Sequence, residues 1–152
     1  MRLLRMTCLV CVVLTLGLSF AHVLEVPGKL QLDGAQWLTV QQHLYVGFGT
    51  LGAAIEVLAI VLAWVLALRL RAAPGGRAAL GAAILTTIGL IAWALIVAPM
   101  NTTLDGWTET TLPPGWAGVR DRWEAGHAAQ AALFFAAFLL LEKGGAREPD
   151  SA

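Results

Sequence analysis

Four apolar stretches, each about long enough to cross a lipid bilayer, constrain this chain more than any other feature. They run from about residue 6 to 24, 45 to 70, 78 to 100 and 125 to 141. Crossing roughly 30 Å of hydrocarbon takes about 20 helical residues, and a helix satisfies its own backbone hydrogen bonds in lipid. We therefore predict an all-α fold, an integral membrane four-helix bundle that forms a single domain over residues 1–152.

Composition supports this fold class and excludes several functions. Hydrophobic residues make up 58% of the 152 residues and charged residues 13%, whereas soluble domains have roughly 25% charged residues. Ten basic residues balance ten acidic ones, so there is no basic surplus for nucleic acid. We expect membrane lipid as a partner and no nucleic acid.

Proline, glycine and helix-capping residues predict the turns between the stretches. Residues 73–76, Ala-Pro-Gly-Gly, predict a tight hairpin between the second and third stretches, and residues 27–28, Pro-Gly, predict the end of the first. Asp33 with Gln36 is typical of a capping box. A helix should therefore begin near Gly34, and the pattern leaves open whether it continues into the second stretch.

The distribution of lysine and arginine predicts the orientation. With the N-terminus inside, seven of these residues lie on the inner side and three on the outer side. The inner ones are Arg2, Arg5, Arg69, Arg71, Arg77, Lys143 and Arg147, and the outer ones are Lys29, Arg120 and Arg122. The positive-inside rule then places both termini in the cytoplasm. We expect a multi-pass protein of the cell (inner or plasma) membrane, with outer loops at about 25–44 and 101–124.

An alternative treats the first stretch as a signal peptide. Residues 19–21, Ser-Phe-Ala, resemble a small-x-small cleavage site after an apolar run. Cleavage would leave three spans and would still place the C-terminus inside.

Polar residues recur along one face of each predicted helix, at spacings of three and four. The faces comprise Cys8, Cys11, Thr15, Ser19 and His22; Glu56 with Gly49, Gly52 and Ala63; Thr87, Ala94 and Asn101; and Glu124, His127 and Gln130. Small residues let another helix approach, which favours a Glu56 that points into the bundle. We expect His22, Glu56 and His127 to approach one another in the outer half.

Glu56 and His127 are the candidate catalytic residues. A charged group within a span costs roughly 2.5–3.5 kcal/mol on insertion scales, and burial favours the neutral form of an acid. Ionisable groups inside a membrane are often functional. The alternatives are a structural hydrogen bond for Glu56 and an interfacial position for His127.

Carboxylate and imidazole pairs raise the question of a metal. Glu124 and His127 have the spacing that di-iron bundles use, and His22 with Glu25 shows it in reverse. Such centres need two of these motifs and two further acids, whereas this chain offers one motif. We predict no resident metal or cofactor and keep a haem or metal electron-transfer protein as an alternative.

A family resemblance is carried by two segments and one histidine. They are residues 99–104, Pro-Met-Asn-Thr-Thr-Leu; residues 116–123, Trp-Ala-Gly-Val-Arg-Asp-Arg-Trp; and His127. The chain resembles a family of small four-span membrane proteins, mostly a bacterial domain of unknown function, that includes the fungal anthrone oxygenases. Gln130 stands where that family usually has Arg, and Thr102 where a basic residue is common. The resemblance implies an oxygenase in which dioxygen attacks an aromatic carbanion without a separate cofactor.

Three functions follow as hypotheses. The first is a cofactor-independent oxygenase acting on an apolar aromatic compound, with His127 or Glu56 as base and with His22, Asn101, Arg120 and Trp123 as substrate-binding residues. We expect its apolar pocket beneath the 101–124 loop, with Glu56 toward the floor. The second is a non-enzymatic accessory subunit or small-molecule binding protein, for which a homodimer would suffice. The third is the electron-transfer protein.

Overall fold

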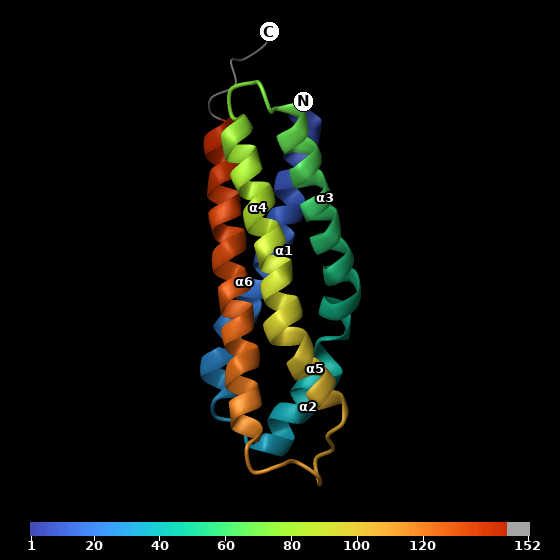
Figure 1. Ribbon diagram of the computed structural model, residues 1–152. Helices are drawn as coiled ribbons and strands as arrows, with labels where there is room; N and C mark the ends of the chain where they lie inside the picture. Colours follow the sequence, from blue (N-terminus) through green and yellow to red (C-terminus); the bar gives the residue numbers. More distant parts are fainter. Residues whose placement is uncertain (146–152) are drawn as a thin grey trace.

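Four long helices carry the four apolar stretches, and each is long and apolar enough to cross a membrane. They run over Arg2–Lys29, Phe48–Arg69, Gly76–Asp105 and Trp116–Gly145. The computed structural model describes residues 1–145, which are 85% helical and contain no strand (Figure 1). The expectations of an all-α fold and of four helices long and apolar enough to span a membrane are therefore confirmed.

The elements follow one another as eight helical segments within residues 1–145. In chain order they are α1 (Arg2–Lys29), α2 (Gly34–Leu44), η1 (Phe48–Gly52), α3 (Ala53–Arg69), α4 (Gly76–Ala92), η2 (Trp93–Val97), α5 (Ala98–Asp105) and α6 (Trp116–Gly145). The segments η1 and η2 are single wide π turns within longer helices. Because η2 leads directly into Pro99, which lacks an N–H, the wide turn lets the helix continue past that proline.

The predicted end of the first helix is wrong. Pro27 lies inside α1, which continues to Lys29. A proline so near a helix end removes only one internal hydrogen bond, and the next turn closes with Leu30 N–H on the Val26 carbonyl at 3.0 Å. The ion pair of Lys29 with Glu25, one turn back, supports the extra turn.

The capping box is confirmed, and it starts a separate helix. The Asp33 carboxylate accepts from the Gln36 N–H at 2.9 Å, and the Gln36 side chain accepts from the Asp33 N–H at 3.2 Å. The resulting α2 ends at Leu44 and does not continue into the second span. In Figure 1 it lies obliquely across one end of the bundle.

The expected outer loops are also shorter than predicted. Residues 101–105 belong to α5 and residues 116–124 to α6, so only residues 106–115 connect the two helices. We name this end of the bundle, formed by α2 and residues 106–115, the loop end. Asn101 and Trp123 therefore stand on helices rather than on a loop.

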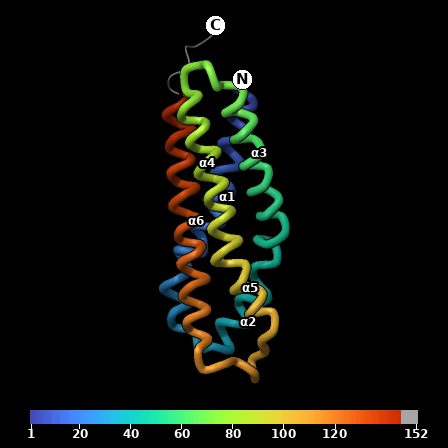
Figure 2. The backbone as a smooth tube through the Cα atoms, in the orientation of Figure 1, coloured from blue at the N-terminus to red at the C-terminus, as the bar shows by residue number. Residues whose placement is uncertain are grey.

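The opposite end holds the chain start, the α3–α4 turn and the end of α6, and we name it the termini end (Figure 2). Arg5 Nη1 donates to the Leu141 carbonyl at 3.2 Å. Gly75 forms the turn with φ 86°, and a Cβ there would lie 2.8 Å from the Gly144 carbonyl oxygen. Arg147, counted in the orientation argument, lies outside the described residues.

Small residues close the bundle toward the termini end. The helices pack in the cyclic order α1, α3, α4, α6, because each contacts the next. Seven of the fourteen buried residues there are alanines: Cys8, Cys11, Val12, Ala59, Ala63, Leu66, Ala67, Leu70, Ala79, Ala82, Ala83, Phe134, Ala137 and Leu141. Alanine lets the backbones approach closely, which is how helices associate in lipid.

One packing contact gives a direct test. A Cβ at Gly126 of α6 would lie 2.5 Å from Cγ2 of Val97 and 3.1 Å from Cγ2 of Ile96, and both are β-branched and stiff. We predict that Gly126→Ala lowers the midpoint of thermal unfolding of the purified protein, at a cost of about 1–3 kcal/mol.

Gly118 on the same helix supplies the matched control. A Cβ there meets no atom within 4 Å, so Gly118→Ala should be neutral or stabilising by up to about 1 kcal/mol. Equal midpoints for the two variants would show that α6 does not pack closely on η2.

Candidate functional site

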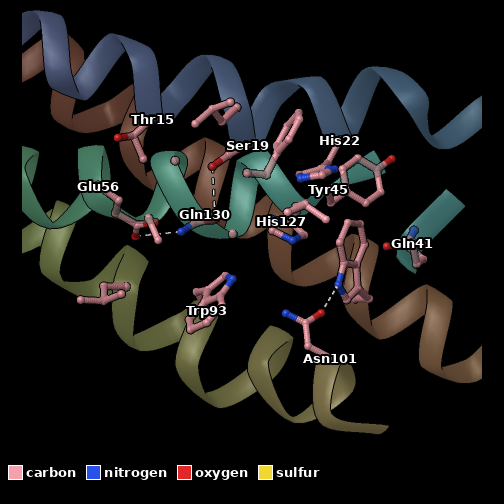
Figure 3. Close-up of a pocket in the computed structure, with 18 of the residues that line it drawn as sticks. Thr15, Ser19, His22, Gln41, Tyr45, Glu56, Trp93, Asn101, His127 and Gln130 are labelled. Carbon is pink, nitrogen blue, oxygen red and sulfur yellow. Dashed lines mark hydrogen bonds between the residues drawn. The ribbon is translucent and has the colours of Figure 1, made fainter. Parts of the chain in front are cut away.

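The bundle is hollow toward the loop end. A pocket of about 680 Å³ lies between the helices, which is within the range of small-molecule sites. Most of its inner surface is apolar, but ten of its 22 lining residues, besides tyrosine and tryptophan, carry polar side chains. The lining residues are Thr15, Leu18, Ser19, His22, Gln41, Gln42, Tyr45, Val46, Phe48, Gly49, Gly52, Ala53, Glu56, Val57, Leu90, Trp93, Asn101, Leu104, Asp105, Trp123, His127 and Gln130. Figure 3 shows the main polar side chains converging on this space.

All the site residues predicted from the sequence line this pocket, with the exception of Arg120. The Arg120 guanidinium lies 2.9 Å from the Asp121 carboxylate and 5.1 Å from the centre of the Trp116 ring. Arg120 therefore lies beside Trp116, and the structure does not bring it to the pocket.

Two buried histidines form one wall. The rings of His22 from α1 and His127 from α6 lie 4.2 Å apart, and the Trp123 ring contacts both edge-on. His22 Nδ1 is 3.6 Å from a Glu25 carboxylate oxygen. His127 Nδ1 is buried and has no hydrogen-bond partner. A buried imidazole nitrogen without a partner has lost its hydrogen bonds to water, and a bound molecule that reached it would restore one.

Gln130, three residues after His127 on α6, connects Glu56 to this part of the pocket. The Ser19 hydroxyl donates to Gln130 Oε1 at 3.1 Å, and Gln130 Nε2 donates to Glu56 Oε1 at 2.9 Å (Figure 3). Gln130 follows His127 by three residues on α6, about 4.5 Å along the helix axis. His22 and His127 therefore meet as expected, whereas Glu56 joins them one turn deeper, through a side chain to which the sequence assigned no role.

A buried lysine, missed as a site residue, organises the loop end of the pocket. Lys29 Nζ lies 3.1 Å from Glu25 Oε2 and 3.2 Å from Glu124 Oε1. It also lies 4.8 Å above the Tyr45 ring and 4.7 Å above the Trp123 ring. Its side chain is only 5% exposed. On a helix that continues through Pro27, the i, i+4 spacing of Glu25 and Lys29 predicts this ion pair.

Two hydrogen bonds fix the aromatic walls. The Tyr45 hydroxyl donates to Glu25 Oε2 at 2.6 Å, and burial together with this bond raises the pKa of Tyr45, so the phenol stays protonated near neutral pH. Trp123 Nε1 donates to Asn101 Oδ1 at 2.7 Å. Asn101 thus orients the indole that the two histidines and Lys29 contact.

The residue set does not fit a metal centre. No group of three or more His, Cys, Asp or Glu within residues 1–145 is arranged to hold a metal ion. Glu124, part of the spacing that resembled a di-iron motif, is paired with Lys29 instead.

Comparison with known protein families, with curated proteins and with solved structures gives no match to this chain. The resemblance to the anthrone oxygenase family stays a prediction that rests on the residues quoted for it.

The Lys29 contacts make a stability prediction. Lys29→Met leaves the buried Glu124 carboxylate without its cation, and breaking a buried pair costs about 3–5 kcal/mol. We expect a lower midpoint of thermal unfolding and partial recovery in Lys29→Met/Glu124→Gln, where the stranded charge is gone. Lys143, the other lysine of the chain, is exposed, and Lys143→Met should leave the midpoint unchanged. A Lys29→Met protein as stable as the parent would show that the ion pair does not hold α1 to α6.

Proposed function

We propose that this chain is a membrane oxygenase that binds an apolar ring compound in the loop-end pocket and uses His127 as the base. The observation that carries the proposal is the unpartnered, buried Nδ1 of His127 in a largely apolar pocket of about 680 Å³. Apolar walls with a few convergent polar groups favour a hydrophobic ligand with a small polar end. The family resemblance supplies the substrate class, a ring compound of the anthrone type.

The reaction balances with dioxygen as the only co-reactant. His127 removes a proton from a CH₂ group that two aryl rings acidify, and the carbanion forms a C–O bond with dioxygen. In the resulting peroxide anion, the electron pair of the remaining C–H bond forms the C=O bond as the O–O bond breaks. The proton of that C–H bond goes to the departing oxygen, which leaves as hydroxide. The hydroxide takes the proton back from His127, so CH₂ and O₂ become C=O and H₂O.

The deeper polar groups have a separate role in this proposal. The Glu56 carboxylate, held by Gln130, accepts a hydrogen bond from a hydroxyl group of the ring compound. The Gln130 amide, held in turn by Ser19, keeps Glu56 turned toward the pocket rather than toward lipid. Glu56 is thus the candidate for substrate orientation, and His127 is the candidate for proton transfer.

The test is turnover of anthrone by the full chain in lipid nanodiscs. We expect oxygen uptake to match anthraquinone formation one to one, after subtraction of the protein-free rate. His127→Gln should lower the rate by about 100-fold or more, the usual contribution of a general base.

His43 provides the control. It is exposed, and its ring bonds locally to the Thr39 carbonyl at 3.0 Å, so His43→Gln should retain the parent rate. Anthrone binding without turnover would favour the binding-protein alternative, and full activity of His127→Gln would remove His127 from the mechanism.

We also propose that both termini face the cytoplasm and that the loop end faces outward. The charge count supports this orientation. A membrane-impermeant maleimide applied to intact cells should modify Thr110→Cys at the loop end and spare Ala73→Cys at the termini end, both of which are exposed positions. Ala73 is preferred to Gly75, whose positive φ disfavours a side chain. The reverse labelling pattern would invert the topology.

A further inference from the structure

The helices α3 and α4 pack together over only part of their length. The buried residues of α3 begin at Ala59, and those of α4 end at Gly89. Trp64 Nε1 donates to Thr87 Oγ1 at 3.0 Å within the packed part. Beyond it, the first half of α3 curves away from α4 in Figures 1 and 2.

The pocket reaches the surface where the two helices part. Four lining residues follow one another at helical spacing and are exposed: Val46, Gly49, Ala53 and Val57. Val46 is 64% exposed and Val57 is 52% exposed, although both line the pocket. The neighbouring stripe of the same segment, which includes Phe48, Gly52 and Glu56, also lines the pocket and is more buried. The first stripe therefore forms one edge of an opening, and Leu90 and Trp93 lie across from it.

The depth and chemistry of this opening point to lipid. Val57 lies nine residues after Phe48, which begins the second span, and this is about 14 Å along the helix. The opening thus reaches about halfway through a hydrocarbon layer of roughly 30 Å. The exposed stripe carries no charged or polar side chain.

Hydrogen bonds close the loop end of the pocket, unlike the side opening. Gln42 Nε2 donates to the Leu104 carbonyl at 3.2 Å and to the Trp107 carbonyl at 3.1 Å, which holds α2 against α5 and against the start of the connection after it. Thr39 Oγ1 donates to Glu109 at 2.7 Å. These bonds cross the end that faces water. The exposed stripe is apolar, so its side chains form no hydrogen bond across the side opening.

We infer that an uncharged, apolar ring compound enters the pocket sideways from the membrane, between η1–α3 and the α4–η2 segment. The wide turns η1 and η2 border the opening on its two sides, and such turns recur at functional sites. The identity of the compound rests on the proposed function, whereas the position of the opening rests on the packing of α3 and α4.

The route is tested by labelling a cysteine inside the pocket, without any turnover. Ser19→Cys places a thiol in the lining, and the native Cys8 and Cys11 are buried, so the parent chain sets the background. N-phenylmaleimide is apolar and partitions into lipid, whereas a sulfonated maleimide carries the same reactive group and stays in water. In nanodiscs we expect N-phenylmaleimide to modify Ser19→Cys at least tenfold faster than the sulfonated reagent does.

Two valines on α3 make a matched pair for blocking the opening. Val57 lines the pocket and is 52% exposed, and Val61, one turn further on, is 51% exposed and does not line it. Val57→Trp should slow modification of Ser19→Cys by N-phenylmaleimide at least tenfold, and Val61→Trp should change it less than twofold.

A pair of glycines provides a second test, in case a valine variant does not fold. A Cβ at Gly49, which lines the pocket, or at Gly47, which does not, would meet no atom within 4 Å. Gly49→Trp should reproduce the block and Gly47→Trp should not. Equal rates within both pairs, or modification by the sulfonated maleimide as fast as by N-phenylmaleimide, would overturn the lateral route. Labelling as expected together with no anthrone oxidation would overturn the proposed reaction alone.

Discussion

Close packing of alanine against alanine at the termini end is the constraint on which the rest of the structure depends. Between helices in lipid there is little hydrophobic driving force, so association relies on van der Waals contact between backbones that approach closely. Ala59, Ala63 and Ala67 are buried on α3, Ala79, Ala82 and Ala83 are buried on α4, and the two helices contact each other. Where these residues stop, the helices part, and the pocket begins.

Polar contacts hold the other half of the bundle around the pocket. Polar groups in a membrane are costly unless they are paired, and here three of the pairings join different helices. Lys29 and Glu124 join α1 to α6, and Gln130 joins α6 both to Ser19 on α1 and to Glu56 on α3. Of these side chains, Ser19, Glu56 and Gln130 line the cavity. His127 lines it as well, and its Nδ1 is buried without a hydrogen-bond partner.

The sequence predicted the helices and most of the candidate site for identifiable physical reasons. The hydrocarbon thickness sets the length of an apolar stretch, and helical periodicity places His22, Glu56 and His127 on inward faces. Both signals depend only on residues near one another in the sequence, so they can be read without knowledge of how the helices pack. The capping box of Asp33 and Gln36 is equally local, and it is present as predicted.

The features that the sequence did not predict depend on contacts between distant segments. Pro27 predicts a helix end because the hydrogen bond that it removes belongs to its own helix. The contacts of Lys29 with Tyr45 and Glu124, which stabilise the extra turn, come from segments that are distant in the sequence. The segment that carries the family resemblance, and the ability of a cation to stabilise an oxyanion, predict Arg120 at the pocket, yet it faces Trp116 and Asp121. Gln130 shares the face of His127, but its link to Glu56 depends on how α3 and α6 sit together.

The central claim is that the loop-end cavity is a binding site for an apolar ring compound. Photo-crosslinking of the full chain in nanodiscs with a diazirine-bearing anthrone, followed by peptide mapping, tests it most directly. We predict crosslinks on α1, α3 and α6 residues of the pocket, such as Leu18, Val57 and Trp123, that excess unlabelled anthrone removes. Crosslinks confined to lipid-facing residues outside the pocket, or crosslinks that unlabelled anthrone does not reduce, would contradict the claim.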